Sequence, residues 1–326
     1  MLYRKLGKTG IEVSEIGFGA WGIGGVTNGA TSYGKTDDER SRDALWKAFE
    51  SGITFYDTSD LYGYGHSESL IGEVFQGHRD RIVIASKVGF IEHNGPQDFS
   101  ASHVRKSIEG SLRRLRTDYV DLYQLHSPKL EDVESDRVVD TLTSLKREGK
   151  IRAFGISARS PADALIAVDR YNFDAIQVNF NLVDQRAVEN GLFALCAQKG
   201  VGVICRTPLC FGFLAGQFSP DVKFDPTDHR STWPQEQIAR WAEAYKLFAE
   251  AVREGTEQSY VQLALRFCLS SEGVSSVIPG MLSVSEVEEN AAASRLGPFA
   301  AAEMEKLSEI HRQNAFFICK KQGGGA

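Results

Sequence analysis

Ile53-Thr-Phe-Tyr-Asp57-Thr-Ser-Asp-Leu-Tyr62-Gly-Tyr-Gly65 is the stretch of sequence around which the fold is organised. Its first residues are β-branched and aromatic, which is typical of a buried strand. The polar residues and glycines that follow do not continue a strand, so a loop begins near Asp57. The pattern therefore places a carboxylate at a strand end and the Tyr62 phenol beside it. This pair indicates proton chemistry; the alternative is a turn-forming Asp and a Tyr that covers an edge.

The composition is that of an ordinary globular protein. The 326 residues are 42% hydrophobic and 25% charged, enough apolar material for a substantial core. A net charge of −6 without a sustained Lys/Arg run argues against a nucleic-acid partner. The sequence shows neither a signal peptide nor an apolar run long enough for a membrane span. We expect a cytoplasmic protein with one domain over residues 1–326, as a monomer or homo-oligomer, with a flexible Gly-rich tail near 321–326.

The cysteines predict neither disulfides nor a metal site. They are odd in number and form no CxxC pair, at positions 196, 205, 210, 268 and 319. No Cys/His spacing typical of a zinc site is present either. We expect buried, reduced thiols and no bound metal.

A unit of strand followed by amphipathic helix recurs along the chain. After a glycine-closed hairpin near residues 3–13, the patterns predict strands at 16–20, 53–57, 81–86, 119–125, 151–156, 174–178, 201–205 and 274–278. They predict helices within 37–52, 67–75, 102–115, 138–149, 164–168, 188–196, 238–252 and 261–268, and near Glu286 and Glu303. Strands alternating with helices imply a parallel sheet covered by helices.

Two architectures satisfy this alternation. An open doubly wound sheet carries its site only where the strand order reverses, whereas a closed barrel brings every C-terminal strand end to one mouth. Polar residues stand at the ends of six consecutive predicted strands: Asp57, Lys87, His126, Ser157, Gln177 and Arg206. The sequence therefore predicts an α/β fold, a (β/α)8 TIM barrel with an N-terminal β-hairpin and extra C-terminal helices.

Gly17-Phe-Gly19-Ala-Trp-Gly22 formally matches the GxGxxG fingerprint of a dinucleotide-binding Rossmann fold. That fingerprint needs a helix after its third glycine, and residues 22–29 are too rich in glycine to form one. We interpret the segment as a loop over the mouth of the site.

Three of these strand-end residues, together with Tyr62 from the loop after Asp57, form one possible catalytic group. Tyr62 would donate a proton, Lys87 would stabilise its anion, Asp57 would hold the lysine, and His126 would orient the substrate oxygen. A phenol has an ordinary pKa of about 10, so we expect the cation to bring that pKa toward neutrality. Each residue also has a structural interpretation, such as a surface lysine or a histidine in a turn.

The motifs together resemble those of aldo-keto reductases, from the hairpin to beyond Asn290. They are Gly17-Phe-Gly, Phe55-Tyr-Asp57-Thr-Ser-Asp-Leu-Tyr62-Gly, Ser86-Lys87, Asp118-Tyr-Val-Asp-Leu-Tyr-Gln-Leu-His126, Gly149-Lys-Ile-Arg-Ala-Phe-Gly-Ile-Ser157, Gln177-Val-Asn-Phe, Pro208-Leu, Val277-Ile-Pro-Gly280 and Glu289-Asn290. The resemblance implies catalysis by Asp57, Tyr62, Lys87 and His126. It implies hydride transfer between a nicotinamide, NADP(H) or NAD(H), and a small-molecule carbonyl or alcohol. A cofactor-binding, redox-sensing regulatory subunit is the alternative.

The resemblance also implies a set of cofactor contacts. Ser157 and Gln177 match positions that bind the carboxamide, and the pyrophosphate and adenine positions match Pro208, Leu209, Gly212, Leu214, Gly216, Gly280, Glu286, Glu289 and Asn290. Two positions depart from the family. Ala158 stands where an Asn is usual, and Arg206 stands where an aromatic ring commonly lies against the nicotinamide.

The loops at the predicted mouth mix aromatic and hydrogen-bonding side chains. Residues that we expect to face substrate are Trp21, Tyr33, His93 and Trp233. Stacking faces among polar groups favour a polyhydroxylated carbonyl, such as a sugar, over a long apolar aldehyde.

The segment 279–290 contains no Lys or Arg to hold a 2′-phosphate. Glu286 there would repel a phosphate but would accept a hydrogen bond from a ribose hydroxyl. We therefore expect NADH to serve about as well as NADPH. The alternative is that Arg295 or Lys223 reaches the phosphate.

Overall fold

The computed structural model describes residues 1–134, 136–252 and 257–318. Within these residues eight parallel strands form one sheet in chain order. The strands are β3 (Phe18–Gly19), β4 (Phe55–Asp57), β5 (Val83–Val88), β6 (Val120–His126), β7 (Ile151–Ser157), β8 (Ala175–Asn179), β9 (Gly202–Arg206) and β10 (Val274–Ile278). Parallel bridges from Ile16 to Val277 and from Gly19 to Gly280 join the first strand to the last. The predicted (β/α)8 barrel is confirmed.

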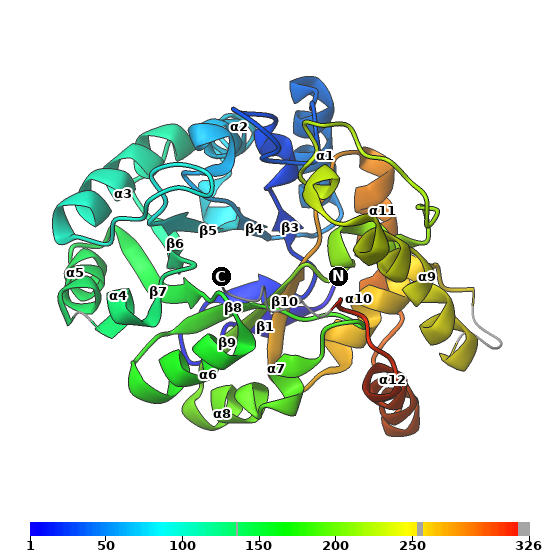
Figure 1. The fold of residues 1–326 in the computed structure, drawn as a ribbon. Coiled ribbons are helices and arrows are strands. Elements are labelled where there is room, and N and C mark those ends of the chain that lie inside the picture. Colours follow the sequence, from blue (N-terminus) through cyan, green and yellow to red (C-terminus); the bar gives the residue numbers. More distant parts are fainter. Residues whose placement is uncertain (135, 253–256, 319–326) are drawn as a thin grey trace, which may run out of the picture.

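Helices surround the strands (Figure 1). The α-helices are α1 (Asp38–Glu50), α2 (His66–Val74), α3 (Ala101–Leu115), α4 (Leu130–Glu134), α5 (Asp136–Arg147), α6 (Pro161–Arg170), α7 (Arg186–Glu189), α8 (Leu192–Lys199), α9 (Gln235–Val252), α10 (Tyr260–Ser270), α11 (Val284–Ala292) and α12 (Ala301–Gln313). The short 3-10 helices are η1 (Gly22–Gly24), η2 (Tyr62–Gly65), η3 (Arg79–Arg81), η4 (Cys210–Ala215), η5 (His229–Thr232) and η6 (Ala293–Arg295).

The barrel closes where β3 meets β10, and this contact requires a glycine. A Cβ on Gly19 would lie 2.6 Å from the Ile278 carbonyl oxygen and 2.9 Å from that of Pro279. Such distances are shorter than any side chain tolerates, so only glycine lets the two backbones approach. The GxGxxG interpretation as a loop is confirmed, since the three-residue 3-10 helix η1, turns and isolated bridges at Ser32 and Tyr33 separate β3 from α1.

An antiparallel hairpin of β1 (Tyr3–Lys5) and β2 (Glu12–Ser14) plugs the barrel end that lies opposite the site. Its apolar residues Leu6, Ile11 and Val13 are buried with inward-facing side chains of the strands, which include Phe55, Val83, Ala85, Leu122, Ala153, Ala175 and Ile204. Alternate strand residues point into the barrel, which explains this periodicity. The interior is therefore a packed core below the site.

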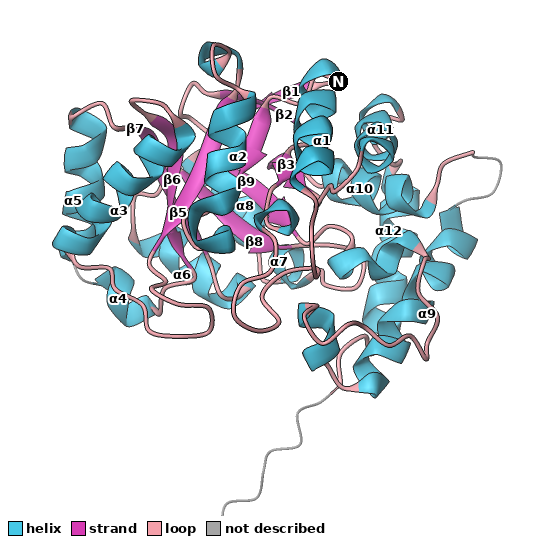
Figure 2. Cartoon of the chain, turned by 90° about the horizontal axis from the view of Figure 1, so that it is seen from above, coloured by secondary structure: helices cyan, strands magenta, loops and turns pink. Residues whose placement is uncertain are grey.

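A second core lies between the strands and the helices. Helix α3 shows how the sequence builds it, because Val104, Ile108, Leu112 and Leu115 form one apolar stripe and are buried. At the other end of the chain α12 packs against α9 beside the barrel (Figure 2). Helices α11 and α12 follow the last strand, where the sequence predicts helices near Glu286 and Glu303.

One predicted helix is wrong in detail. The segment 188–196 was expected as a single helix, but the chain forms α7 and then α8, separated at Gly191 with φ 81°. A left-handed residue interrupts the helical hydrogen-bond ladder, and glycine adopts that conformation at little cost. The long connection after β9 contains the short 3-10 helices η4 and η5.

Three further expectations concern the cysteines, a membrane span and the number of domains. Cys196, Cys205, Cys210 and Cys268 are buried free thiols, as expected, whereas Cys319 and the predicted tail at 321–326 lie outside the described residues. No helix among the described residues is long and apolar enough to cross a membrane. The single-domain assignment stays a prediction.

Candidate active site

The six polar residues at the strand ends lie together at one mouth of the barrel. The register pairs neighbouring strands residue by residue, with His126 opposite Ser157 and Ser157 opposite Gln177. On the next strand, Asn179 lies opposite Arg206. Because the strands are parallel, residues far apart in the chain reach the same level of the barrel.

Lys87 links Asp57 to Tyr62 at the floor of this mouth. The lysine Nζ donates to the Asp57 Oδ1 at 2.5 Å, to the Thr58 carbonyl oxygen at 2.8 Å and to the Tyr62 hydroxyl at 3.2 Å. Asp57 and Lys87 are buried at 2% and 0% exposure. All three ammonium protons therefore have acceptors, which is the condition for burying this charge.

The pKa shifts of Tyr62 and Lys87 differ in one respect from the expectation. Burial raises the pKa of the Tyr62 phenol above its ordinary value, and the Lys87 ammonium only opposes this rise. Burial also disfavours the charged form of Lys87, but Asp57 and Tyr62 overcome this and raise the lysine pKa. The expected direction of the lysine's effect is right, and the expected net fall of the Tyr62 pKa is wrong. Loss of hydration outweighs one neighbouring cation.

Two amides hold the second oxygen of Asp57. Its Oδ2 accepts from the Gln177 Nε2 at 2.7 Å and from the Gln124 Nε2 at 3.1 Å. Ser157 completes the network by donating to the Gln177 Oε1 at 3.3 Å. Sequence reasoning missed Gln124, although it lies two residues before His126 and so shares that residue's inward face.

His126 faces Tyr62 and Phe90 with the planes of the rings nearly perpendicular, at centroid distances of 5.8 and 5.0 Å. Its Nδ1 lies 3.2 Å from the Ser59 Oγ, a contact that sequence reasoning also missed. Burial, aided by the charges of Lys87 and Arg206, holds the pKa of His126 well below its usual value. The imidazole is therefore neutral near pH 7.

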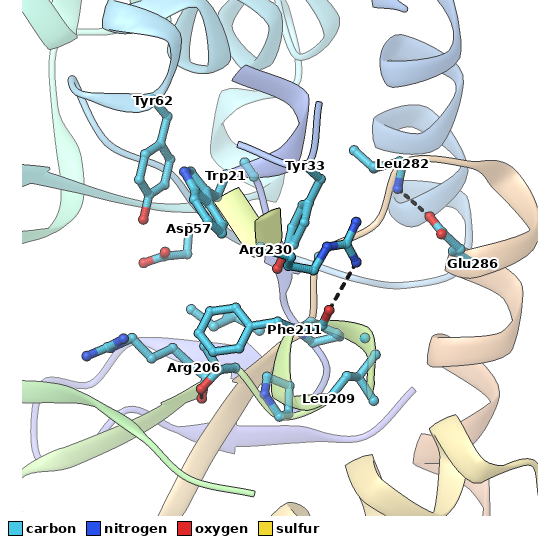
Figure 3. Close-up of a pocket in the computed structure, with 18 of the residues that line it drawn as sticks. Trp21, Tyr33, Asp57, Tyr62, Arg206, Leu209, Phe211, Arg230, Leu282 and Glu286 are labelled. Carbon is cyan, nitrogen blue, oxygen red and sulfur yellow. Dashed lines mark hydrogen bonds between the residues drawn. The ribbon is translucent and has the colours of Figure 1, made fainter. Parts of the chain in front are cut away.

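A cavity of about 540 Å³ opens from this floor. Of the residues predicted from the sequence, those that line it are Trp21, Tyr33, Asp57, Tyr62, His93, His126, Gln177, Arg206, Pro208, Leu209, Gly212, Gly280, Glu286, Glu289 and Asn290. Figure 3 shows Asp57 and Tyr62 toward one end and Leu282 and Glu286 at the other. The cavity is thus elongated, with the candidate catalytic tetrad of Asp57, Tyr62, Lys87 and His126 at one end of it.

The remaining predicted residues lie behind the cavity wall. Lys87 and Ser157 are buried beneath it, and Leu214 is 1% exposed. Gly216 faces the rings of Tyr245 and Tyr260. Trp233 packs on Phe211 and Trp241, at centroid distances of 4.8 and 5.0 Å. These residues shape the wall, and their roles toward a ligand stay predictions.

The loop after β9 folds back over the cavity and meets the loop after β3. Arg230 pairs with Asp228 at 2.6 Å, donates to the Phe211 carbonyl oxygen at 3.2 Å and lies 4.8 Å from the Tyr33 ring centroid (Figure 3). Its charge is therefore already paired within the wall.

Comparisons with known proteins agree with the geometry of the site. Residues 15–312 match the model of the aldo/keto reductase family. The chain belongs to the aldo/keto reductase family. It is 34% identical to L-galactose dehydrogenase of Arabidopsis thaliana, over 94% of this chain and 92% of that protein. It is 30% identical to the NADH-specific methylglyoxal reductase of Escherichia coli (strain K12), over 88% of this chain and 92% of that protein.

A solved structure agrees. Aldo-keto reductase AKR11C1 from Bacillus halodurans, in its holo form, superposes with a TM-score of 0.78 at 30% identity and covers 95% of this chain and 96% of that one. The present protein is thus an aldo/keto reductase, an oxidoreductase that uses NAD(P)H to reduce carbonyl groups.

The cavity of this aldo/keto reductase fits a nicotinamide cofactor. A Cβ on Gly280 would meet only the Tyr33 ring, at 3.6 Å, so the glycine leaves space in the cavity wall. Thr207, Cys210 and Phe211 have positive φ, a strained backbone that occurs mainly at functional sites. Of these three residues, Thr207 and Phe211 line the cavity.

Proposed function

We propose that Asp57, Tyr62, Lys87 and His126 reduce a small carbonyl compound in the manner that their geometry supports. The observation that carries this proposal is the Lys87 Nζ, which is shared between the Asp57 carboxylate and the Tyr62 hydroxyl. A bound reduced nicotinamide supplies the hydride. The protein's own part is to orient the carbonyl and to deliver the proton.

Tyr62 is the proton donor in this scheme. Its hydroxyl lies at the cavity surface, and its raised pKa keeps the phenol protonated and ready to donate near pH 7. When the proton leaves, the Lys87 ammonium stabilises the tyrosinate, and the Asp57 carboxylate keeps that ammonium in place. His126 is neutral and lines the same wall, so it orients the substrate oxygen.

The cofactor contacts follow from the lining residues. Gln177 and Arg206 lie beside the tetrad and would hold the nicotinamide end, whereas Glu286, Glu289 and Asn290 would hold the adenosine end. Gln177 already donates to Asp57, and its carbonyl oxygen accepts one hydrogen bond from Ser157, so the second lone pair of that oxygen is left for a carboxamide. The Arg206 Nη2 donates to the Ala158 carbonyl oxygen at 3.0 Å, which ties together the two positions that depart from the family.

NADH is expected to support reduction within about tenfold of NADPH in kcat/KM. The lining residues of segment 279–290 include no cation, and the Glu286 Oε2 is fixed by the Leu282 amide at 2.5 Å. Losing one charge-assisted contact to a 2′-phosphate costs roughly 1.5–3 kcal/mol, a factor of about ten or more. The NADH-specific relative supports this proposal. The measurement is kcat/KM with both cofactors in wild type and Glu286→Gln.

A matched control is Glu288→Gln on the same helix, since Glu288 is exposed and pairs with Lys47 instead. It should leave the cofactor ratio unchanged, and Glu286→Gln should shift it toward NADPH. A hundredfold preference for NADPH that survives in Glu286→Gln would mean that Arg295, Lys223 or another residue binds the phosphate.

We further propose that the substrate is a polyhydroxylated carbonyl such as a sugar. The cavity interleaves the rings of Trp21, Tyr33 and Phe90 with the polar side chains of His93 and Asn94. Aromatic faces stack on sugar rings while polar groups bind hydroxyls. The similarity to L-galactose dehydrogenase supports the same class.

A panel of aldoses, ketoses and aliphatic aldehydes tests this proposal. Sugars should show the higher kcat/KM, and His93→Leu should lower it about fivefold for sugars, since one hydrogen bond is worth about 1 kcal/mol, while aliphatic aldehydes change little. A higher kcat/KM with aliphatic aldehydes than with every aldose and ketose would reject the proposal that the substrate is a sugar. Cofactor binding without turnover across the panel would instead favour the redox-sensing alternative.

A further inference from the structure

Ser59 and Asp60 stand behind His126, on the side away from the cavity. The Ser59 Oγ lies 3.2 Å from the His126 Nδ1 and 3.3 Å from the Asp60 Oδ1. The same oxygen accepts a hydrogen bond from the Leu61 amide at 3.1 Å. A histidine of the candidate tetrad is therefore connected to a second carboxyl group through one hydroxyl.

The hydroxyl has one proton and two acceptors that compete for it. If Ser59 donates to Asp60, its remaining lone pair must accept from His126, so the imidazole carries its proton on Nδ1. If Ser59 donates to His126, the imidazole carries its proton on Nε2, the nitrogen that remains for a ligand. The two distances are nearly equal, so the charge on Asp60 decides.

The surroundings of Asp60 allow both of its charge states. Its Oδ2 accepts a short hydrogen bond from Ser107 on α3, and the nearby Glu68 and Arg114 act in opposite directions on its charge. Burial is the largest influence and raises the Asp60 pKa to about 6. On the other side, burial together with the charges of Lys87, Arg206 and His93 lowers the pKa of His126 and keeps it neutral.

We propose that Asp60 is a positioning residue that selects the tautomer of His126 through Ser59, and thereby sets the pH range in which the site favours carbonyl reduction. The proposal rests on the proposed role of His126 in orienting the substrate oxygen. Neither Ser59 nor Asp60 lines the cavity, so each acts only through the imidazole.

The direction of the effect follows from the proton count. Below the Asp60 pKa the carboxyl is protonated, Ser59 donates to Nδ1, and Nε2–H donates to a carbonyl oxygen. Above it the carboxylate takes the Ser59 proton, because a charge-assisted bond is roughly twice as strong as a neutral one. Nε2 then offers a lone pair, which suits the hydroxyl of an alcohol and not a carbonyl. Reduction is favoured at lower pH and oxidation at higher pH.

The tautomer can be measured directly, without cofactor, from the ¹⁵N shifts and two-bond couplings of labelled histidine, with His126→Gln giving the assignment. Wild type should carry Nε2–H at about pH 5 and Nδ1–H at about pH 8, with a midpoint near the pKa of Asp60. In Asp60→Asn the Nε2–H form should persist across this range. The exposed Glu92→Gln, on a loop at the cavity mouth, is the matched control and should keep the wild-type transition.

Activity gives a second readout. In wild type, kcat for reduction should fall as the pH rises through about 6. This fall should be absent in Asp60→Asn. Should that variant fail to fold, Ser59→Ala breaks the same connection and should likewise abolish the pH-dependent change of tautomer. One tautomer at both pH values in wild type, or a transition that survives in either variant, would overturn the proposal. Since the tautomer is read in the free protein, failure here is distinct from failure of the catalytic roles, which Tyr62→Phe tests.

Discussion

Tyr62→Phe is expected to lower kcat for carbonyl reduction about a thousandfold, because general acid catalysis contributes roughly 10²–10⁴-fold. The substitution removes only the hydroxyl that accepts from Lys87 and leaves the ring against His126. Cofactor affinity should therefore change little. Single-turnover rates and fluorescence titration of the cofactor measure the two quantities separately.

Tyr64→Phe is the matched control for this prediction. Tyr64 lies on the same 3-10 helix, η2, but is 50% exposed and does not line the cavity. Loss of the Tyr64 hydroxyl should leave kcat unchanged. If Tyr62→Phe kept more than about a tenth of wild-type kcat, another group would have to deliver the proton.

Lys87→Met is expected to destabilise the protein by about 3 kcal/mol and to remove activity. Asp57 would remain buried without its cation, and an uncompensated buried charge costs roughly 3–5 kcal/mol. The two glutamine amides still hold its other oxygen, which places the expected cost at the lower end of that range. Urea unfolding and kcat are the measurements.

The double variant Lys87→Met with Asp57→Asn separates structure from chemistry. It removes both charges, so most of the stability should return, while kcat should stay at the level of the single variant. The surface variant Lys146→Met is the control, since its ion pair with Asp174 should contribute less than about 1 kcal/mol. Recovery of activity in the double variant would show that Lys87 serves only to neutralise Asp57.

Much of the site was predictable because parallel strands deliver their ends to one place. Asp57, Lys87, His126, Ser157, Gln177 and Arg206 are each recognisable locally as a polar residue that ends an apolar run. The barrel topology alone then brings the six together. The recognised motifs added the cofactor and the reaction class, which strand patterns do not specify.

The contacts between site residues have no local signal in the sequence. Gln124 contacts Asp57 across 67 positions of the chain, and Gln177 does so across 120. Which of these amides points at the carboxylate depends on strand register and on neighbouring side chains. The net pKa of Tyr62 was mispredicted for the same reason, because the depth of burial is a property of the whole fold.

Hydrophobic periodicity and turn residues act over short distances, so the sequence alone predicts the alternation of strand and helix, the barrel and the four candidate catalytic residues. How those residues are connected depends on the packing of the whole fold. It showed Asp57 held by two amides, Arg230 paired within the cavity wall, and Ser59 placed between His126 and Asp60. Each of these contacts depends on where a side chain is buried and which way it turns, and only the packed molecule fixes both.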